Sequence, residues 1–142
     1  MLILLYNSFV FFNKGGILLD NVWNVTWNDV VTFVENVAKH YKDATISGVY
    51  GIPRGGIILA SLLSYRLDVP MLLAPSKNCI VIDDISDTGE TLLHFDRNSS
   101  DNGKKKGYHI VTMFYKKGSL VKPEFYMFEK TNSWIVYPWE DK

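Results

Sequence analysis

The chain has 142 residues, of which 47% are apolar, with 15 basic and 15 acidic side chains. This length suits one domain with its own core, and the apolar fraction is typical of a globular protein. The balanced charge argues against a nucleic-acid partner, because such proteins usually carry excess positive charge. The single cysteine, Cys79, excludes an intrachain disulfide, makes a Cys-rich metal site implausible and fits a reducing, cytoplasmic setting.

Residues 1–21 form an apolar and aromatic extension that is too short and too interrupted to span a membrane. The extension also lacks the basic start and the small-residue cleavage site of a signal peptide. We therefore expect no membrane partner. We expect the extension to add an edge strand, to pack at a subunit interface or to reflect an upstream choice of start codon. Residues 22–142 are expected to form a single domain.

Strand-like and helix-like patterns alternate along the rest of the chain. Thr26 and Asp29 have the spacing of a capping box, at the start of an amphipathic helix that reaches about Tyr41. Apolar and β-branched runs predict strands, separated by helices, at residues 45–50, 69–73, 80–83 and 109–115. This alternation predicts an α/β fold with a mostly parallel sheet flanked by helices. Residues 98–103 and the lysines at 104–106 are expected to form an exposed, charged loop.

A glycine-rich turn follows the first of these strands, ahead of a helix-like run at residues 57–67. A Gly-Gly turn is most often an ordinary strand-to-helix connection. Here, however, the Arg54 guanidinium is placed where it could grip a diphosphate, and Gly55 and Gly56 leave backbone donors accessible around it. The pattern therefore indicates a candidate anion site.

Residues 79–92 are the most informative stretch of the chain. Their apolar first half suits a buried central strand that ends in two carboxylates, Asp83 and Asp84. In the loop at residues 88–91, backbone N–H groups and two hydroxyls can face one anion, and the next helix adds its positive amino end. We interpret this as a sugar-phosphate site. Phosphoryl-acceptor and other nucleotide-binding α/β domains also carry an Asp-Asp strand before a Gly loop, so those readings stay open.

Together these motifs resemble the signature of the type I phosphoribosyltransferases, which use 5-phosphoribosyl-1-diphosphate (PRPP) as donor. The resemblance covers roughly residues 22–142 and implies that family's α/β fold, with a small C-terminal hood region. It implies that Asp83 and Asp84 hold the ribose hydroxyls, directly or through Mg²⁺ at Asp84. The 5′-phosphate would be bound by Thr88, Gly89, Glu90 and Thr91. The pyrophosphate would be bound by Arg54, Gly55 and Gly56, with a non-proline cis peptide near Arg54.

The carboxyl-terminal third resembles the 6-oxopurine branch, in particular the xanthine-guanine and hypoxanthine phosphoribosyltransferases of bacteria and archaea. By this resemblance Lys116 donates to the oxygen at purine C6, Trp134 stacks on the base, and the backbone near Ile135 reads the base edge. Asp87 would face N7 as a general acid/base and be catalytic together with Asp83 and Asp84. Each signal has an ordinary alternative, because an Asp before a helix often caps it and a late Trp is usually core.

The activity implied by the resemblance is a pentosyl transfer from PRPP to a 6-oxopurine base, in purine salvage, by a homodimer or homotetramer. One departure from the family bears on this activity. Between Leu73 and Cys79 only residues 74–78 remain, where the family carries a long flexible loop that folds over the site. Without that cover water could reach the reacting centre. Three outcomes stay open: a slow transferase, a site closed by the extension or a neighbouring subunit, or a regulatory module that binds PRPP or a nucleotide without turnover.

Overall fold

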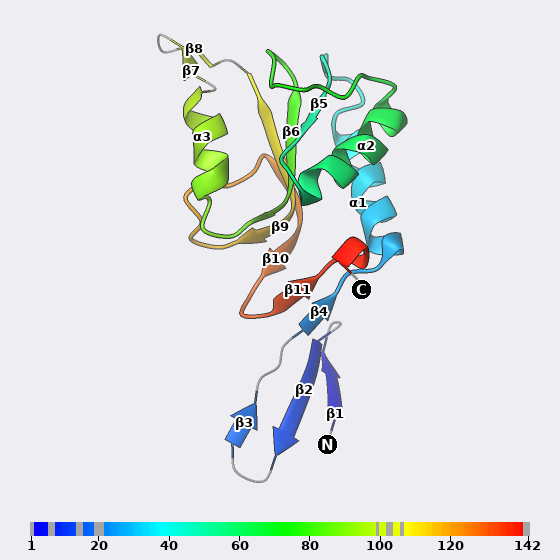
Figure 1. The fold of residues 1–142 in the computed structure, drawn as a ribbon, viewed down its shortest axis with the longest axis vertical. Helices are drawn as coiled ribbons and strands as arrows, with labels where there is room; N and C mark the ends of the chain where they lie inside the picture. The colour runs from blue at the N-terminus through cyan, green and yellow to red at the C-terminus, as the bar shows by residue number, and fades with distance from the viewer. Residues whose placement is uncertain are drawn as a thin grey trace. The chain divides into compact units, whose positions relative to one another are not determined.

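The computed structural model of the chain divides into two compact units (Figure 1). The terminal unit comprises Met1–Val31 and Thr131–Lys142, and the central unit comprises Thr32–Lys130. The residues that the structure describes are 2–5, 8–13, 16–18, 22–98, 100–101, 104–105 and 107–140. The assignment of residues 22–142 to a single domain stays a prediction.

A four-stranded parallel sheet with the order β10-β9-β6-β5 forms the centre of the central unit. The strands are β5 (Val49–Gly51), β6 (Ile80–Ser86), β9 (His109–Lys116) and β10 (Phe125–Lys130). Because all the pairs are parallel, the carboxyl ends of the four strands lie at one edge, which we call the carboxyl edge. The opposite edge is the amino edge. The predicted α/β fold with a mostly parallel sheet is confirmed.

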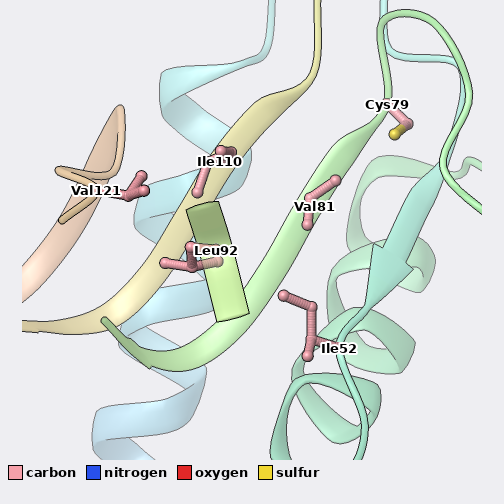
Figure 2. Close-up of a cluster of buried hydrophobic side chains, with 6 residues drawn as sticks. All are labelled: Ile52, Cys79, Val81, Leu92, Ile110 and Val121. Carbon is pink, nitrogen blue, oxygen red and sulfur yellow. The ribbon is translucent and has the colours of Figure 1, made fainter. Parts of the chain in front are cut away.

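Helices cover both faces of this sheet, with α3 (Glu90–Asn98) on one side and α2 (Gly55–Leu67) on the other (Figure 1). Side chains alternate between the two faces of a strand. Val81 of β6 therefore points toward the α3 side, where it belongs to a cluster with Leu92 and Ile110 (Figure 2). Its neighbours Ile80 and Ile82 are fully buried on the opposite face. Burial on both faces explains why the first three residues of β6, up to Ile82, are all apolar.

The helix α1 (Trp27–His40) confirms the predicted capping box. The backbone N–H of Thr26 donates to Oδ2 of Asp29 at 2.9 Å, and the N–H of Asp29 donates to Oγ1 of Thr26 at 3.1 Å. These reciprocal bonds satisfy two donors that the first turn of the helix cannot pair internally. The helix ends at His40, within one residue of the predicted end.

The predicted strand at residues 69–73 is wrong, because the structure has only an isolated bridge between Met71 and Val49 at this place. Two bonds make the bridge: Val49 N–H donates to the Pro70 carbonyl, and Leu72 N–H donates to the Val49 carbonyl. Pro70 itself has no N–H to extend the ladder. The strand predicted at 45–50 begins only at Val49 and ends at Gly51, as β5. The residues before it form a loop, in which the hydroxyl of Ser47 donates to the carbonyl of Lys77 at 2.8 Å.

The terminal unit contains a second sheet with the order β1-β2-β4-β11, in which β3 also pairs with β2. Its strands are β1 (Leu2–Leu5), β2 (Ser8–Asn13), β3 (Gly16–Leu18), β4 (Val22–Asn24) and β11 (Trp134–Val136), followed by a 3₁₀ turn, Pro138–Glu140. The extension thus adds strands to this second sheet, which was one of its three expected roles. Its role at a subunit interface stays a prediction.

The expected loop at residues 98–103 differs from the structure in two ways. The helix α3 continues through Asn98, and Ser100–Asp101 (β7) pairs with Lys104–Lys105 (β8) in an antiparallel hairpin. Residues 99, 102, 103 and 106 lie outside the described residues, as does the predicted exposure of this charge cluster. In the part of the chain that the structure describes, no helix has both the length and the apolar character needed to cross a bilayer.

Candidate functional site

The carboxyl edge of the central sheet brings together most of the residues that the motifs single out. The glycine loop follows β5, the two carboxylates lie near the end of β6, and the Asp87 loop comes next in the chain. Lys116 is the last residue of β9. All these elements belong to the central unit. Parallel strands in open α/β sheets bind ligands at this edge, so the placement is that of a ligand site.

The glycine loop packs directly against the end of β6. A Cβ atom built on Gly55 would collide with the carboxylate of Asp84, and one built on Gly56 would collide with the carbonyl oxygen of Ile82. A larger residue at Gly56 would push the loop away from the backbone of β6, and one at Gly55 would displace either the loop or the Asp84 side chain. The two glycines therefore allow the loop to lie beside Asp84, which brings the two predicted anion motifs together at the carboxyl edge. The predicted accessible donor at Gly56 is wrong, because its N–H donates to the carbonyl of Ile52 at 2.9 Å.

Arg54 precedes the first residue of α2 and is exposed at this edge. The peptide bond between Pro53 and Arg54 is cis, which confirms the expected non-proline cis peptide. The amino end of α2 adds partial positive charge to the charge of the Arg54 guanidinium. A guanidinium and a helix amino end in one short loop suit an anion with several oxygens, such as a diphosphate.

Asp83 and Asp84 form a half-buried carboxylate pair. The backbone N–H of Asp84 donates to Oδ1 of Asp83 at 2.9 Å. Burial, and then the charge of Asp84, raise the pKa of Asp83 to about 8. A cation or a pair of hydroxyl donors placed against the two carboxylates would offset the cost of ionising both. The pair is therefore suited to ribose hydroxyls or to a divalent cation.

The predicted phosphate loop turns sharply at Gly89 and packs against the connection after β9. Gly89 has a φ of +85°, and a Cβ there would lie 2.5 Å from Oγ of Ser119 and 2.7 Å from the nitrogen of Leu120. The carbonyl of Thr88 accepts the N–H of Leu120 at 2.9 Å, which holds the loop against the connection after β9. Helix α3 begins at the next residue and aims its amino end at the loop. Three exposed residues complete it: Thr88, Glu90 and Thr91.

Asp87 lies between two lysines. Its Oδ2 accepts a hydrogen bond from Nζ of Lys130 at 2.9 Å, and its Oδ1 is 3.5 Å from Nζ of Lys116. The hydrogen bond from Lys130, then the charges of Lys130 and Lys116, hold the pKa of Asp87 below its usual value despite partial desolvation. Asp87 is thus a carboxylate at neutral pH and presents hydrogen-bond acceptors at this edge.

Comparison with solved structures identifies the fold. The chain is similar to a purine phosphoribosyltransferase from Pyrococcus horikoshii Ot3, with 26% identity and a TM-score of 0.71 over 84% of this chain and 94% of that one. It is also similar to the xanthine-guanine-hypoxanthine phosphoribosyltransferase of Helicobacter pylori, with 20% identity and a TM-score of 0.64 over 80% of this chain and 88% of that one. The fold is that of a type I phosphoribosyltransferase. The resemblance that the motifs indicated is confirmed.

Other comparisons place limits on this result. An APRTase from Giardia lamblia, complexed with 9-deazaadenine, has the same fold with 20% identity and a TM-score of 0.59 over 75% of this chain and 82% of that one. Structural similarity therefore extends across phosphoribosyltransferases named for different purines. No protein-family model and no curated protein matches the chain.

The two remaining base-site candidates lie in the other unit. Trp134 and Ile135 belong to β11, which pairs in parallel with β4 of the terminal unit. The Trp134 side chain is 73% exposed, so it is not a core residue. An exposed indole is available for stacking on a ligand, which is the role that the phosphoribosyltransferase resemblance implies. The structure brings Lys116 to the carboxyl edge and leaves the placement of Trp134 and Ile135 beside it a prediction.

Two groups at the candidate site were missed by the sequence reasoning. One is Lys130, which ends β10 as Lys116 ends β9, so the same signal of a lysine after an apolar strand was present. The other is Ser86, whose buried hydroxyl lies 2.7 Å from that of Ser119 and donates to the carbonyl of Val121 at 2.9 Å. These bonds tie the end of β6 to the turn that supports the phosphate loop.

Among the described residues, no group of three or more His, Cys, Asp or Glu side chains is placed to hold a metal ion. The Asp83–Asp84 pair is still compatible with Mg²⁺ as phosphoribosyltransferases use it. Mg²⁺ commonly takes only one or two protein carboxylates and completes its shell with waters and substrate phosphates. Burial and the charge of Asp84 raise the pKa of Asp83, and a cation bound to the pair would lower it.

Proposed function

We propose that the chain is a purine phosphoribosyltransferase that transfers the 5-phosphoribosyl group of PRPP to a 6-oxopurine, giving a nucleoside 5′-monophosphate and pyrophosphate. The observation that carries the proposal is the meeting of three parts at one sheet edge: the Arg54 loop against Asp84, the phosphate loop, and an ionised Asp87 between lysines. Similarity to a purine phosphoribosyltransferase over 94% of that chain supports it.

The donor half of the reaction needs charge stabilisation at two places. When the bond between ribose C1′ and the pyrophosphate oxygen breaks, C1′ becomes oxocarbenium-like and the leaving group keeps the bonding electrons. Arg54 and the amino end of α2 stabilise the pyrophosphate, while Asp83 and Asp84 bind the ribose hydroxyls and place negative charge near C1′. The amino end of α3 and the loop at Thr88 hold the 5′-phosphate.

The Asp83–Asp84 pair would hold Mg²⁺, with Asp84 as the principal ligand. When bound, the ion supplies positive charge that neutralises part of the donor's pyrophosphate. The residues themselves orient the ribose, and the glycines at 55 and 56 keep the Arg54 loop close enough to share the same donor molecule.

The acceptor half of the reaction rests on Asp87 and Lys116. As N9 of the base attacks C1′, the Asp87 carboxylate takes the proton from N7. Lys116 carries only donors, so it matches the oxygen at C6 of a 6-oxopurine and mismatches the amino group that adenine has there. We assign stacking on the base to Trp134 and recognition of its edge to the backbone near Ile135.

Turnover is the test of this proposal. Purified protein with Mg²⁺ and PRPP is offered guanine, xanthine, hypoxanthine, adenine and orotate in parallel, and nucleotide product is separated and quantified. We expect nucleotide from the 6-oxopurines alone. Product from adenine would overturn the acceptor assignment, and product from orotate would overturn the purine assignment. Cytoplasmic location and a homodimeric or homotetrameric state are further proposals, checked by fractionation and light scattering.

A second candidate function is a regulatory module that binds PRPP or a nucleotide without turnover. The observation that favours it is the short connection between Leu73 and Cys79. This connection is a tight turn, because the N–H of Cys79 donates to the carbonyl of Ser76 at 3.1 Å and the Ser76 hydroxyl lies 3.0 Å from that of Ser47. A turn held in this way cannot cover the site as a lid. Detectable PRPP binding by calorimetry, with no product from any base, would select this candidate.

A further inference from the structure

Lys130 and Lys116 are neighbours in the structure although they are not neighbours in the chain. They are paired residues in the parallel register of β10 and β9, at the last position of each strand. Their side chains approach the same carboxylate, Asp87, from two strands. The Lys130 side chain is 16% exposed, whereas those of Lys116 and Asp87 are 48% and 42% exposed. Lys130 is therefore the inner member of the pair.

The two lysines contact different oxygens of Asp87 at different distances. Nζ of Lys130 donates to Oδ2 at 2.9 Å, which is a charge-assisted hydrogen bond of normal length. Nζ of Lys116 is 3.5 Å from Oδ1, beyond a good hydrogen bond. The shorter, more buried contact has the greater effect on the carboxylate, since the surrounding protein screens it less than water does. Lys116 is the partner that can leave Asp87 at lower cost.

We propose that Lys130 is a positioning residue for the transfer: it fixes the orientation of the Asp87 carboxylate while Lys116 turns to the acceptor base. The inference rests on the proposed function. When Lys116 moves to the base, Asp87 keeps one charged partner, because Lys130 remains hydrogen-bonded to Oδ2 at 2.9 Å. A single lysine would have to divide itself between Asp87 and the base oxygen. Two lysines separate these tasks, with Lys130 on Oδ2 and Oδ1 left to face N7.

Among the described residues, the charged side chains in contact with Asp87 are those of Lys116, from β9, and Lys130, from β10. Both keep the carboxylate in the form that can accept a proton. The hydrogen bond from Lys130 is the largest cause of the lowered pKa of Asp87, which agrees with the geometry. A base must be unprotonated to act, so this pair extends activity toward acidic pH.

The experiment compares Lys130→Met with Lys130→Arg and with Lys122→Met as a matched control. Lys122→Met removes the same charge from an exposed lysine, whose Nζ lies 6.0 Å from the centroid of the Tyr126 ring. The pH profile of kcat/KM and the separate kcat and KM for PRPP are measured with the preferred base. Carboxyl NMR of the free protein follows the titration of Asp87 without any need for turnover.

For Lys130→Met we expect kcat to fall by roughly tenfold to a hundredfold, because the base is misplaced, with the KM for PRPP unchanged. The acid limb of kcat/KM and the Asp87 titration should both move to higher pH. Lys130→Arg should restore both, and Lys122→Met should match the parent. An unshifted acid limb and titration in Lys130→Met would overturn the inference. If Lys130→Met does not fold, the same comparison is made with Lys130→Gln.

The carboxyl NMR separates failure of this inference from failure of the proposed function. If the parent protein shows no turnover but its Asp87 titration shifts in Lys130→Met, the ion pair is supported and the proposed function is wrong. If the parent turns over normally but neither the Asp87 titration nor kcat changes in Lys130→Met, the proposed function stands and the inference about Lys130 is wrong.

Discussion

The amino and carboxyl edges of the central sheet each carry a cluster of polar side chains around one carboxylate, and the clusters differ in the partners of that carboxylate. At the carboxyl edge Asp87 faces two lysines beside two glycine-containing loops. At the amino edge Oε2 of Glu124 accepts the hydroxyl of Tyr41 at 2.9 Å and lies 2.8 Å from Nδ1 of His109. The rings of Tyr41 and His109 pack with centroids 5.0 Å apart.

The amino-edge cluster ties three elements together at their ends. Tyr41 follows α1, His109 begins β9, and Glu124 immediately precedes β10. Burial, and then the hydrogen bond and charge of Glu124, raise the pKa of Tyr41, so its hydroxyl stays protonated and keeps donating. The carboxylate receives both partners from the protein itself. The comparison teaches that exposure does not distinguish the two edges, because the side chain of Glu124 is 50% exposed and that of Asp87 is 42% exposed. The edges differ in the partners of the carboxylate, which are a tyrosine and a histidine at the amino edge and two lysines beside glycine-containing loops at the carboxyl edge.

The largest expected effect comes from Asp87→Asn, which removes the proposed base at the carboxyl edge. We expect turnover to fall by about 10²–10⁴-fold, while PRPP binding measured by calorimetry changes little. Asp68→Asn is the matched control, because Asp68 has a left-handed φ of 54° that asparagine also tolerates. Equal losses of turnover and donor binding in Asp87→Asn would count against the role given to Asp87.

Next in size is Gly55→Ala, which places a methyl group against the Asp84 carboxylate. Either Asp84 or the Arg54 loop must shift, and a shift of this kind can lower kcat/KM for PRPP by roughly tenfold to a hundredfold. The melting temperature should change little. Gly56→Ala is the contrast, because its methyl meets the buried carbonyl of Ile82 and should lower stability as well. A Gly55→Ala protein with normal PRPP kinetics would show that the Arg54 loop is not part of the donor site.

A smaller effect is expected when Asp83→Asn is measured by the stability of the free protein, without donor or Mg²⁺. Burial raises the pKa of folded Asp83 from 3.8 to about 8, so between these values the unfolded chain has lost a proton that the folded chain keeps. The free energy of unfolding therefore falls as pH rises through this window. Asp83→Asn should remove that decline and be more stable than the parent at pH ~8, by about 1–3 kcal/mol. Urea denaturation of both proteins without Mg²⁺, at the two ends of this pH window, measures the free energy of unfolding. An equal change in that free energy with pH in the parent and in Asp83→Asn would refute the prediction.

The smallest effect is predicted for the amino edge. Tyr41→Phe deletes the hydroxyl that donates to Glu124 and should lower the free energy of unfolding by about 1 kcal/mol. Turnover should stay at the parent level, because the cluster and the candidate site lie at opposite ends of β9. Urea denaturation and steady-state kinetics on the same preparation test both parts. A loss of turnover comparable to that of Asp87→Asn would show that the two edges do not divide their roles as the structure indicates.

Local patterns in the sequence predicted much of the carboxyl edge. The apolar run before Asp83 and the loop at Gly89 are contiguous signals, because a buried strand and an anion-binding turn need particular residues in direct succession. The strand predicted at 69–73 is interrupted at Pro70. Its apolar composition could not show that the segment lies outside β5, on the exposed side of the sheet. Lys130 was missed because a lysine after a strand is usually only solvated, and its partner is 43 residues away.

By itself the sequence determined the features that act within a few residues: the capping box at Thr26, the glycines beside Arg54, and the acidic pair that follows the apolar half of β6. These follow from hydrogen bonds and steric limits that neighbouring residues impose on one another. Only the tertiary structure decided which distant groups meet. Strand order and the parallel register of β9 and β10 set Lys130 beside Lys116, and that register depends on packing across the whole sheet.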